Sequence, residues 1–297
     1  MRSKHTSRVA VLLILPAVVL ILLIIAYPLV YSLFSSFQLA DGGWGLDHYQ
    51  TVLGSKEFWS AFKNTLLFTA GIVSAEIVLG FIVALGLQKL PTHVRNVCRG
   101  LMIIPLLISP VIASYEWMWM LNDQYGLVNQ ILGAIGITPP LWLVKPGWAF
   151  FSISLVDIWV STPFVILVFQ SALASLPKEP YEQAELDGAS ALKKFLYLTL
   201  PYLRGPLIVV LIIRTMDVFR IYDAIAVLTG GGPGTATTSL SLLAFRTGID
   251  FGRMQQSSAM SLLMMIPILI VTAFYIRMIF SGEGEETRKK PARFRRK

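Results

Sequence analysis

Arg214, Asp217, Arg220 and Asp223 recur at every third position with alternating charge, inside an otherwise apolar stretch. Residues three apart are neighbours on a helix surface, so these charges can pair. Each charge inside a membrane costs roughly 2.5–3.5 kcal/mol, so four facing lipid would cost about 10 kcal/mol. We therefore expect them to face a partner helix or a water-filled path. They form either an ionic ladder that fixes the register between two membrane subunits or a polar lining for a hydroxyl-rich solute.

Further polar and aromatic residues extend this candidate path. Glu76, Glu116 and Asp157 are acids in other apolar runs, and we expect them to be buried. Glu116 lies among tryptophans and a tyrosine, a mixture that sugar sites use, although aromatic residues near a membrane edge also form interfacial belts. The rings of Phe219 and Tyr222 could stack on a sugar face or simply pack. The candidate path residues are Glu116, Asp157, Arg214, Asp217, Phe219, Arg220, Tyr222 and Asp223.

A second stretch, "YEQAELDGASALKKFLYLTLPYL", begins at Tyr181 and is charged and helix-prone. Pro180 suits the first position of a helix, where its missing N–H costs nothing. Glu179 and Glu182 would lie in the first turn, where the helix dipole favours anions. Gly188 can adopt the left-handed conformation that ends a helix. The first half of the stretch is therefore expected to be a short helix followed by a sharp turn.

The second half is expected to be another helix, capped by Ser190, running through Leu200 and ended by Pro201. The stretch holds more apolar residues than a loop bathed only in water would. Something must cover these apolar side chains, either lipid headgroups around an amphipathic loop or a cytoplasmic partner protein. The apolar positions are Ala184, Leu186, Ala189, Leu192, Phe195, Leu196 and Leu198.

The elements that carry these residues are long apolar runs. Apolar residues make up 55% of the 297 residues and charged residues 14%, with a mean hydropathy of +0.66. A soluble domain carries about 25% charged residues. We expect Pro105, Pro110 and Pro163 to kink their helices. An all-α polytopic membrane protein with six transmembrane helices is predicted, because six runs reach the roughly 20 residues of a span: 9–31, 64–87, 101–121, 148–176, 206–228 and 257–280.

Lysine and arginine residues predict the orientation, because cytoplasmic loops carry an excess of them. One side of the predicted membrane holds 18 and the other five. Both termini and the loop 177–205 are therefore expected to be cytoplasmic. Residues 1–8 form a basic N-tail, 9–280 the six-helix domain and 281–297 a basic C-tail. The net charge of +8 suits anionic lipid better than nucleic acid, since no basic patch with interleaved aromatics is present.

Enzyme motifs are missing from the sequence. It contains no G-x-x-x-x-G-K-[ST], no H-E-x-x-H and no G-x-S-x-G. The glycines of "GGGPG" at 230–234 lack the lysine of a phosphate loop and indicate a turn. A single cysteine, Cys98, and three scattered histidines predict neither a disulfide nor a metal site. The chain is not expected to be an enzyme, so energy for uphill transport must come from a gradient or from another chain.

The loop resembles the EAA loop of ABC importer permeases. The stretch "EQAELDGA", followed by a phenylalanine, "LTLP" and Pro206, follows the pattern of that loop, with mild departures at Gln183 and Leu198. "STPF", "YGLVN", "KNTLLFT" and "LTGGGPGTAT" are similar to the sugar-importer branch, the maltose, trehalose and glycerol-phosphate type. The basic C-terminal end favours the first, maltose-permease-F-like member of a permease pair. The residues that match the loop pattern are Glu182, Ala184, Asp187, Gly188, Ala189, Phe195, Leu200, Pro201 and Pro206.

This resemblance implies the type I importer permease fold, with the loop as a coupling helix that inserts into a separate ATPase. It implies a permease for a sugar or sugar-like solute, such as trehalose or maltose, in a bacterial or archaeal cytoplasmic membrane. Its partners would be a second permease, two ATPase subunits that bind ATP and Mg²⁺, and an extracytoplasmic solute-binding protein. No cofactor is expected in this chain. The alternatives are an ion-coupled secondary transporter that uses the charges of 206–228 as a relay, and a membrane scaffold without a solute.

Overall fold

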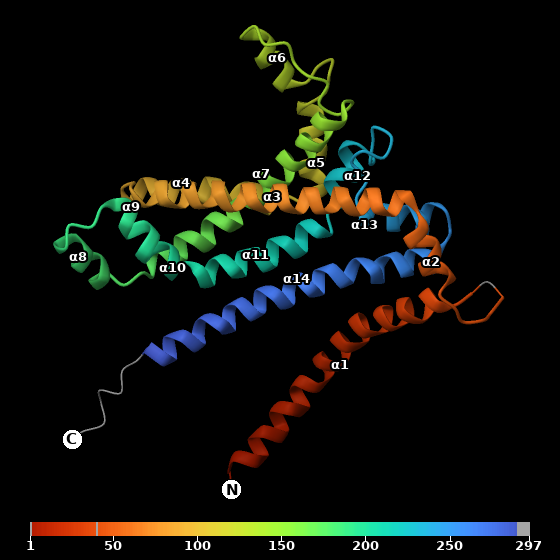
Figure 1. Ribbon diagram of the computed structural model, residues 1–297, viewed down its shortest axis with the longest axis horizontal. Coiled ribbons are helices and arrows are strands. Elements are labelled where there is room, and N and C mark those ends of the chain that lie inside the picture. Colours follow the sequence, from red (N-terminus) through yellow and green to blue (C-terminus); the bar gives the residue numbers. More distant parts are fainter. Residues whose placement is uncertain (1, 40, 290–297) are drawn as a thin grey trace. The chain divides into compact units, whose positions relative to one another are not determined.

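The computed structural model describes residues 2–39 and 41–289, which form helices and their connections (Figure 1). Side chains are described for residues 13–39 and 41–278. Within these ranges, the pairing of Gln38 with Trp44 is an isolated antiparallel bridge. The side chains of the predicted basic tails, 1–8 and 281–297, lie outside the described residues. The predicted all-α fold class is confirmed.

The described chain divides into two compact units. The first comprises Met1–Phe58 and Leu243–Ile266. In it, the ring of Phe37 lies 5.1 Å from that of Tyr49, whose hydroxyl lies 2.8 Å from Ser36 Oγ. These contacts join the end of α1 to α2. The unit contains α1 (Arg2–Phe37), α2 (Asp47–Gly54), the π-helix η2 (Arg246–Asp250), and the first parts of α3 (Lys56–Gln88) and α14 (Met254–Lys289).

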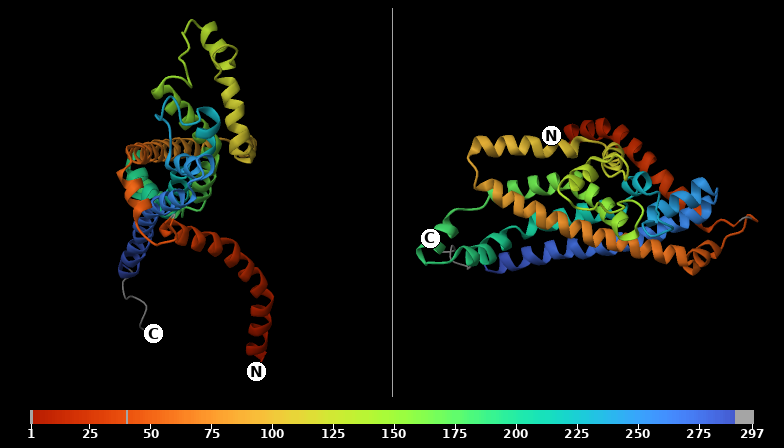
Figure 2. Two further views of the ribbon diagram at one scale, coloured as in Figure 1. Left: turned by 90° about the vertical axis from the view of Figure 1, so that its right-hand side faces the viewer. Right: turned by 90° about the horizontal axis from the view of Figure 1, so that it is seen from above.

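The second unit comprises Trp59–Leu242 and Pro267–Lys297 and holds most of the helices. Its central element is α7, which packs against α4, α5, α11 and α12. Figure 1 and the right-hand view of Figure 2 show α8 and α9 at the end of the unit where α7 finishes. Besides the longer part of α3 and the part of α14 from Pro267 onward, its helices are α4 (Thr92–Leu107), α5 (Pro110–Met120), α6 (Leu127–Ala134), α7 (Pro146–Ala174), α8 (Glu179–Leu186), α9 (Ala191–Lys194), the π-helix η1 (Phe195–Thr199), α10 (Leu200–Tyr202), α11 (Arg204–Phe219), α12 (Asp223–Leu228) and the start of α13 (Leu240–Phe245).

The core of the second unit lies where α3, α7 and α12 meet. Phe68 and Ile72 of α3, Ile153 of α7 and Ile225 of α12 are fully buried there. The ring of Phe68 stacks on that of Phe150 with centroids 3.9 Å apart. The same cluster includes Val218 of α11, the helix that carries Arg214 and Asp217.

Further along, α3 and α7 approach closely at a glycine. A Cβ atom at Gly80 would lie 2.7 Å from Cγ1 and 2.9 Å from Cβ of Val165. Real Cβ atoms do not come so close to another side chain. The absence of a side chain at position 80 therefore allows this helix contact.

Four described helices are long and apolar enough to cross a membrane, and the number rises to six if each of two bent helix pairs counts as one span. The four are Leu13–Phe37, Lys56–Gln88, Pro146–Ala174 and Met254–Met278. They correspond to the predicted runs 9–31, 64–87, 148–176 and 257–280. Pro163 lies inside the unbroken α7, so it does not divide that span.

The predicted span 101–121 is sharply bent, and the expected kink at Pro110 is confirmed. The chain bends by 96° between α4 and α5, where Ile108 and Ser109 leave the helix. Pro110 causes this break, because it has no N–H to donate and disfavours helical backbone at the residue before it. Ser109 is accordingly extended, and Pro110 begins α5. Pro105 lies in the last turn of α4.

The run 206–228 is also interrupted, at a place that no proline or glycine marks. The helix α11 ends at Phe219, and α12 begins at Asp223. The carbonyl of Ile221 accepts a hydrogen bond at 2.8 Å from Ser239 Oγ, far along the chain. A side chain from a later segment thus supplies the hydrogen bond that this carbonyl would otherwise accept within a continuous helix. The chain also bends by 61° between the helical segments Ala191–Tyr202 and Arg204–Leu228.

The glycine-rich segment after α12 is an ordered turn, as predicted. Gly230, Gly231 and Gly234 all have positive φ, which favours glycine. The side-chain amide of Asn64 donates to the carbonyls of Thr235 and Thr238, at 3.2 and 3.1 Å. Two of the quoted motifs, "KNTLLFT" and "LTGGGPGTAT", are therefore in direct contact.

Candidate functional site

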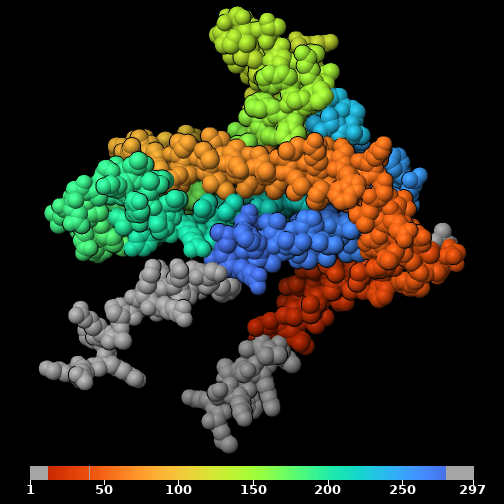
Figure 3. All heavy atoms as spheres, in the orientation of Figure 1, coloured from red at the N-terminus to blue at the C-terminus, as the bar shows by residue number. Residues whose placement is uncertain are grey.

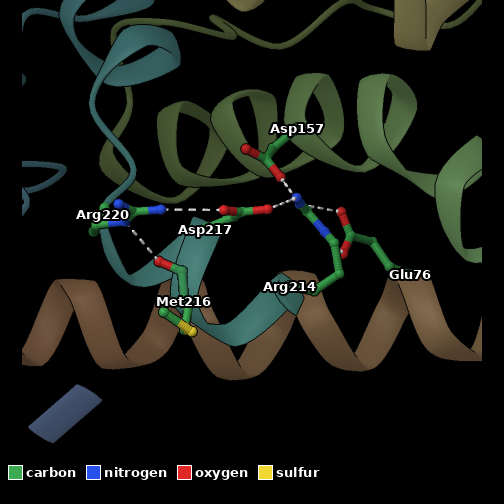
Figure 4. A network of polar contacts seen from close by, with 6 residues as sticks. All are labelled: Glu76, Asp157, Arg214, Met216, Asp217 and Arg220. Atoms are coloured by element: carbon green, nitrogen blue, oxygen red, sulfur yellow. Dashed lines mark hydrogen bonds and ion pairs between the residues drawn. The ribbon is translucent and has the colours of Figure 1, made fainter. Parts of the chain in front are cut away.

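Arg214 on α11 stands at the centre of a network of ion pairs (Figure 4). Its Nε and Nη2 atoms donate to the two carboxylate oxygens of Glu76 on α3, each at 2.7 Å. Nη2 also donates to Oδ1 of Asp157 on α7 at 2.6 Å, and Nη1 lies 3.5 Å from Oδ2 of Asp217. The other oxygen of Asp217 lies 3.3 Å from Nη2 of Arg220. One guanidinium thus joins three helices of the chain.

Exposure increases along this network from one end to the other. The side chain of Glu76 is fully buried and that of Arg214 is 8% exposed, whereas 46% of Asp217 and 57% of Arg220 are exposed. Bidentate hydrogen bonding between a guanidinium and a carboxylate is the strongest geometry for such a pair. A buried ion pair is tolerated only with geometry of this quality, and removing one partner strands the other charge.

The predicted pairs at a spacing of three, Arg214 with Asp217 and Asp217 with Arg220, are confirmed. The ladder does not extend to Asp223, which lies beyond the end of α11 and begins α12. The ladder hypothesis places the fixed register between two subunits. Within the described chain, the buried part of the network joins α3, α7 and α11 of one subunit.

A cavity of about 400 Å³ lies at the more exposed side of the network. Both broken spans contribute to its lining, with Pro110 and Ser114 from the start of α5 and Ile221 and Ala224 from around the end of α11. Non-helical backbone is tolerated at membrane depth only where it is buried in protein or lines an aqueous cavity. The lining contains six of the eight candidate path residues, namely Asp157, Arg214, Asp217, Arg220, Tyr222 and Asp223.

The other two candidates lie elsewhere. The expectation that Glu116 is buried is wrong, because it is exposed on α5 and does not line the cavity. Phe219 is buried and packs inside the unit. Sequence reasoning missed Ser114 and Ser161, which do line the cavity. Single serines in apolar helices usually bond to their own backbone, as Ser114 does to the carbonyl of Pro110, so their type alone gave no signal.

The loop 177–205 has the two-helix form predicted for its centre. Pro180 lies in the first turn of α8, and Gly188 has a φ of +70°. Ser190 caps α9 by accepting a hydrogen bond at 3.4 Å from the backbone N–H of Lys193. The prediction that Pro201 ends the second helix is wrong. The backbone widens into η1 just before it, and Pro201 then lies in the first turn of α10, where its missing N–H is not needed.

The loop is tied together and to the rest of its unit by a few side chains. Lys194 Nζ donates to Glu185 Oε1 at 2.7 Å, and this ammonium lowers the pKa of the Glu185 carboxyl below its ordinary value. We call this contact the loop ion pair. The ring of Phe195 turns inward, with its centroid 5.6 Å from that of Phe81 on α3. Phe195 therefore anchors the loop instead of facing outward.

Several other apolar side chains of the loop are exposed. Leu186 is 88% exposed, Leu192 66% and Tyr197 77%. Figure 3 shows the loop, coloured green, open on the side in view. Of the remaining matched positions, Glu182, Asp187 and Leu200 are exposed, and Ala184 and Ala189 are partly buried. The loop thus presents an apolar surface that no described part of its own unit covers on that side.

Comparisons with known proteins agree with these features. Residues 76–282 match the family described as "Binding-protein-dependent transport system inner membrane component". The trehalose/maltose transport system permease protein MalF of Thermococcus litoralis is 38% identical, over 92% of this chain and 94% of that protein. The trehalose transport system permease protein SugA of Mycobacterium tuberculosis is 32% identical, over 91% and 88%. The sulfoquinovosyl glycerol transport system permease protein SmoG of Agrobacterium fabrum is 34% identical, over 91% and 90%.

A solved structure shares the fold. The chain superposes with a TM-score of 0.83 on a chain of a bacterial ABC transporter that imports the acidic polysaccharide alginate. The match covers 92% of this chain and 96% of that chain, at 23% identity. The predicted importer-permease fold is confirmed. The chain belongs to the inner-membrane components of binding-protein-dependent transport systems, and the predicted role of a permease, not an enzyme, is confirmed with it.

Proposed function

We propose that this permease forms part of the translocation path for a sugar or sugar-like solute, with a disaccharide such as trehalose or maltose as the leading candidate. The observation that carries the proposal is the cavity beside the ion-pair network. Its volume of about 400 Å³ falls within the range of small-molecule sites, roughly 300–1,000 Å³. Its carboxylates and hydroxyls suit a solute rich in hydroxyl groups. Relatives named for trehalose and maltose support this solute class.

The loop 177–205 is proposed to be the docking element for a separate ATPase, which binds ATP and Mg²⁺. Exposed leucines on a stiff, glycine-turned helix pair support this role, because apolar surface of this kind needs a cover. The complete importer would contain two ATPase subunits, a second permease and an extracytoplasmic solute-binding protein. Residues 1–8 and 281–297 would be basic tails on either side of the permease domain, 9–280.

The proposed location is the cytoplasmic membrane of a bacterium or archaeon, with both termini and the docking loop in the cytoplasm. The distribution of lysine and arginine supports this orientation, since 18 of them lie on that side and five on the other. An ATPase that uses cytoplasmic ATP must meet the permease there. Cysteine accessibility in intact cells tests the orientation, because a probe at the docking loop should react only after the membrane is opened.

The docking role is tested with the double variant Leu186→Ser and Leu192→Ser, purified gently from its host membrane. Both side chains are mostly exposed, so the permease should still fold and insert. We expect the ATPase subunits to be lost from the purified complex while the second permease stays. The matched control, Leu127→Ser with Ile135→Ser, changes exposed apolar residues in the connection between the third and fourth spans. Retention of the ATPase in the loop variant and wild-type uptake would refute the docking role.

A backbone change tests the same element independently. Gly188 has positive φ, and no atom lies within 4 Å of where its Cβ would be. A valine at this position would strain the backbone without a steric clash, because β-branched residues rarely adopt this conformation. Gly188→Val should therefore uncouple or release the ATPase while leaving insertion of the permease intact.

The family assignment gives no support to ion-coupled secondary transport. The two mechanisms still differ in a direct measurement, namely uptake by cells treated with an ionophore while ATP is kept high. An ATP-driven importer continues under those conditions, and an ion-coupled transporter stops.

A further inference from the structure

We propose that the cavity discriminates against anionic solutes and admits neutral, hydroxyl-rich ones, because its charges leave an excess of carboxylates. This inference rests on the proposed function, in which the cavity is part of the solute path. It goes further by assigning a charge preference to this chain and by naming Asp223 and Arg220 as residues that set it.

The first step is that Arg214 is not available to bind an anion. Its Nε and Nη2 atoms are both engaged by the buried Glu76, and Nη2 is shared with Asp157. Its Nη1 faces Asp217 at 3.5 Å. All the nitrogen atoms of this guanidinium therefore already face carboxylate oxygens. A solute carboxylate or phosphate could reach it only by displacing one of them.

The second step concerns Arg220, the other cation of the lining. Its Nη2 lies 3.3 Å from Asp217, and its Nε donates to the carbonyl of Met216 at 3.1 Å. Its side chain is 57% exposed, so it remains the one lining cation that a solute can approach. Its charge is partly offset by Asp217, which lies between the two arginines (Figure 4).

The third step is the balance of charge. The lining holds three acids, Asp157, Asp217 and Asp223, and two bases, Arg214 and Arg220. The buried Glu76 is bound directly to the first of these bases. Carboxylates therefore outnumber guanidiniums both in the lining and in the ion-pair network. Unfavourable charge contacts are one way in which a site rejects a competing ligand.

The same groups favour a neutral sugar. An ionised carboxylate only accepts hydrogen bonds, so it pairs with hydroxyl donors. The exposed carboxylate of Asp217 and that of Asp223 line the cavity together with the hydroxyl of Ser161. A solute with many hydroxyl groups can donate to these acceptors, whereas an added carboxylate would face acceptors of its own charge.

The test compares two probes that differ only in charge. Maltose and glucuronosyl-α-1,4-glucose differ by a carboxylate in place of one hydroxymethyl group. Their affinities are measured by competition against radiolabelled maltose on the purified assembly of both permeases and both ATPase subunits, without the solute-binding protein, so that selection upstream does not contribute. We expect the wild type to bind the anionic sugar at least about tenfold more weakly, since one unit charge near an unpaired carboxylate has an effect of this order.

Two single variants change the charge of the cavity in opposite directions. Asp223→Asn removes one negative charge, and the ratio of the two dissociation constants should fall several-fold. Arg220→Gln removes one positive charge, and the ratio should rise. Because both variants change only this chain, charges contributed by the second permease cancel in the comparison with wild type.

The outcomes separate this inference from the proposed function. If the neutral sugar binds and the anionic sugar binds equally well, the charge inference is refuted and the sugar path stands. A ratio that neither variant changes also refutes it. If neither sugar binds the wild type, the proposed sugar function is overturned, and the inference with it.

Discussion

Replacing Arg214 by methionine tests the ion-pair network directly. Methionine keeps an unbranched, flexible apolar stem, although a shorter one, and removes the charge. Glu76 is fully buried, and both of its carboxylate oxygens are bound by this arginine. The substitution therefore strands a buried carboxylate. Breaking a buried pair in this way costs about 3–5 kcal/mol, because the remaining charge loses its partner without regaining water.

The loss of Arg214 should cost less at the two neighbouring acids. Asp157 is 21% exposed and Asp217 46% exposed, so water can replace part of what the guanidinium supplies. Most of the loss is therefore assigned to Glu76. A compensating change, Glu76→Gln, removes the stranded charge, so the double variant should recover about 2–3 kcal/mol relative to the sum of the single changes.

The assay is thermal unfolding of the purified transporter, followed as the loss of the intact peak in size-exclusion chromatography after heating. Arg220→Met is the matched control, since it removes the same charge from an exposed pair. Exposed pairs contribute roughly 0–1 kcal/mol. Unfolding of the Arg214→Met variant at the wild-type temperature would refute the buried-pair argument. Failure of Glu76→Gln to restore stability would show that the loss has another origin.

Three further predictions use the other contacts. Gly80→Ala should lower the free energy of unfolding by about 1–3 kcal/mol through overpacking against Val165. The control, Gly71→Ala on the same helix, has no atom near its Cβ and should not lower this free energy. Heat denaturation measures both. Asn64→Ala should cost about 1–3 kcal/mol by leaving loop carbonyls without a donor, and backbone hydrogen exchange in 229–239 should quicken. The pKa of Glu185 is lowered in the folded chain, so the loop ion pair contributes to stability above the ordinary glutamate pKa, and this contribution is lost as the pH falls through the lowered pKa. Glu185→Gln should abolish this acid dependence, measured as the pH dependence of thermal unfolding.

Local chemistry made the loop predictable from the sequence. A glycine with positive φ and a capping serine act on the residues beside them, and both Gly188 and Ser190 behave as expected. Pro201 failed as a helix end because the chain accommodates it by widening the preceding turn into η1. That adjustment depends on how the loop joins the rest of its unit, and the local pattern does not contain it.

Long-range pairing made the rest unpredictable. The acids Glu76 and Asp157 could be recognised as costly inside a membrane, but nothing in their spacing assigns both of them to Arg214. The interruption after Phe219 carries no proline or glycine, and its extra carbonyl is satisfied by Ser239 from a later segment. Contacts between distant segments determine both features, whereas composition and periodicity report only on neighbours.

The location of the cavity follows from the helix breaks. A continuous apolar helix satisfies its own backbone and offers a solute only side chains, whereas a broken one exposes polar backbone that must be bound or hydrated. Both broken spans, at Pro110 and after Phe219, contribute to the cavity lining. The ion-pair network holds α3, α7 and α11 together beside the second break, so that the backbone can be non-helical there without separating the helices. Charges that would be costly in a straight span thus support a region of the described chain where a polar solute can be accommodated.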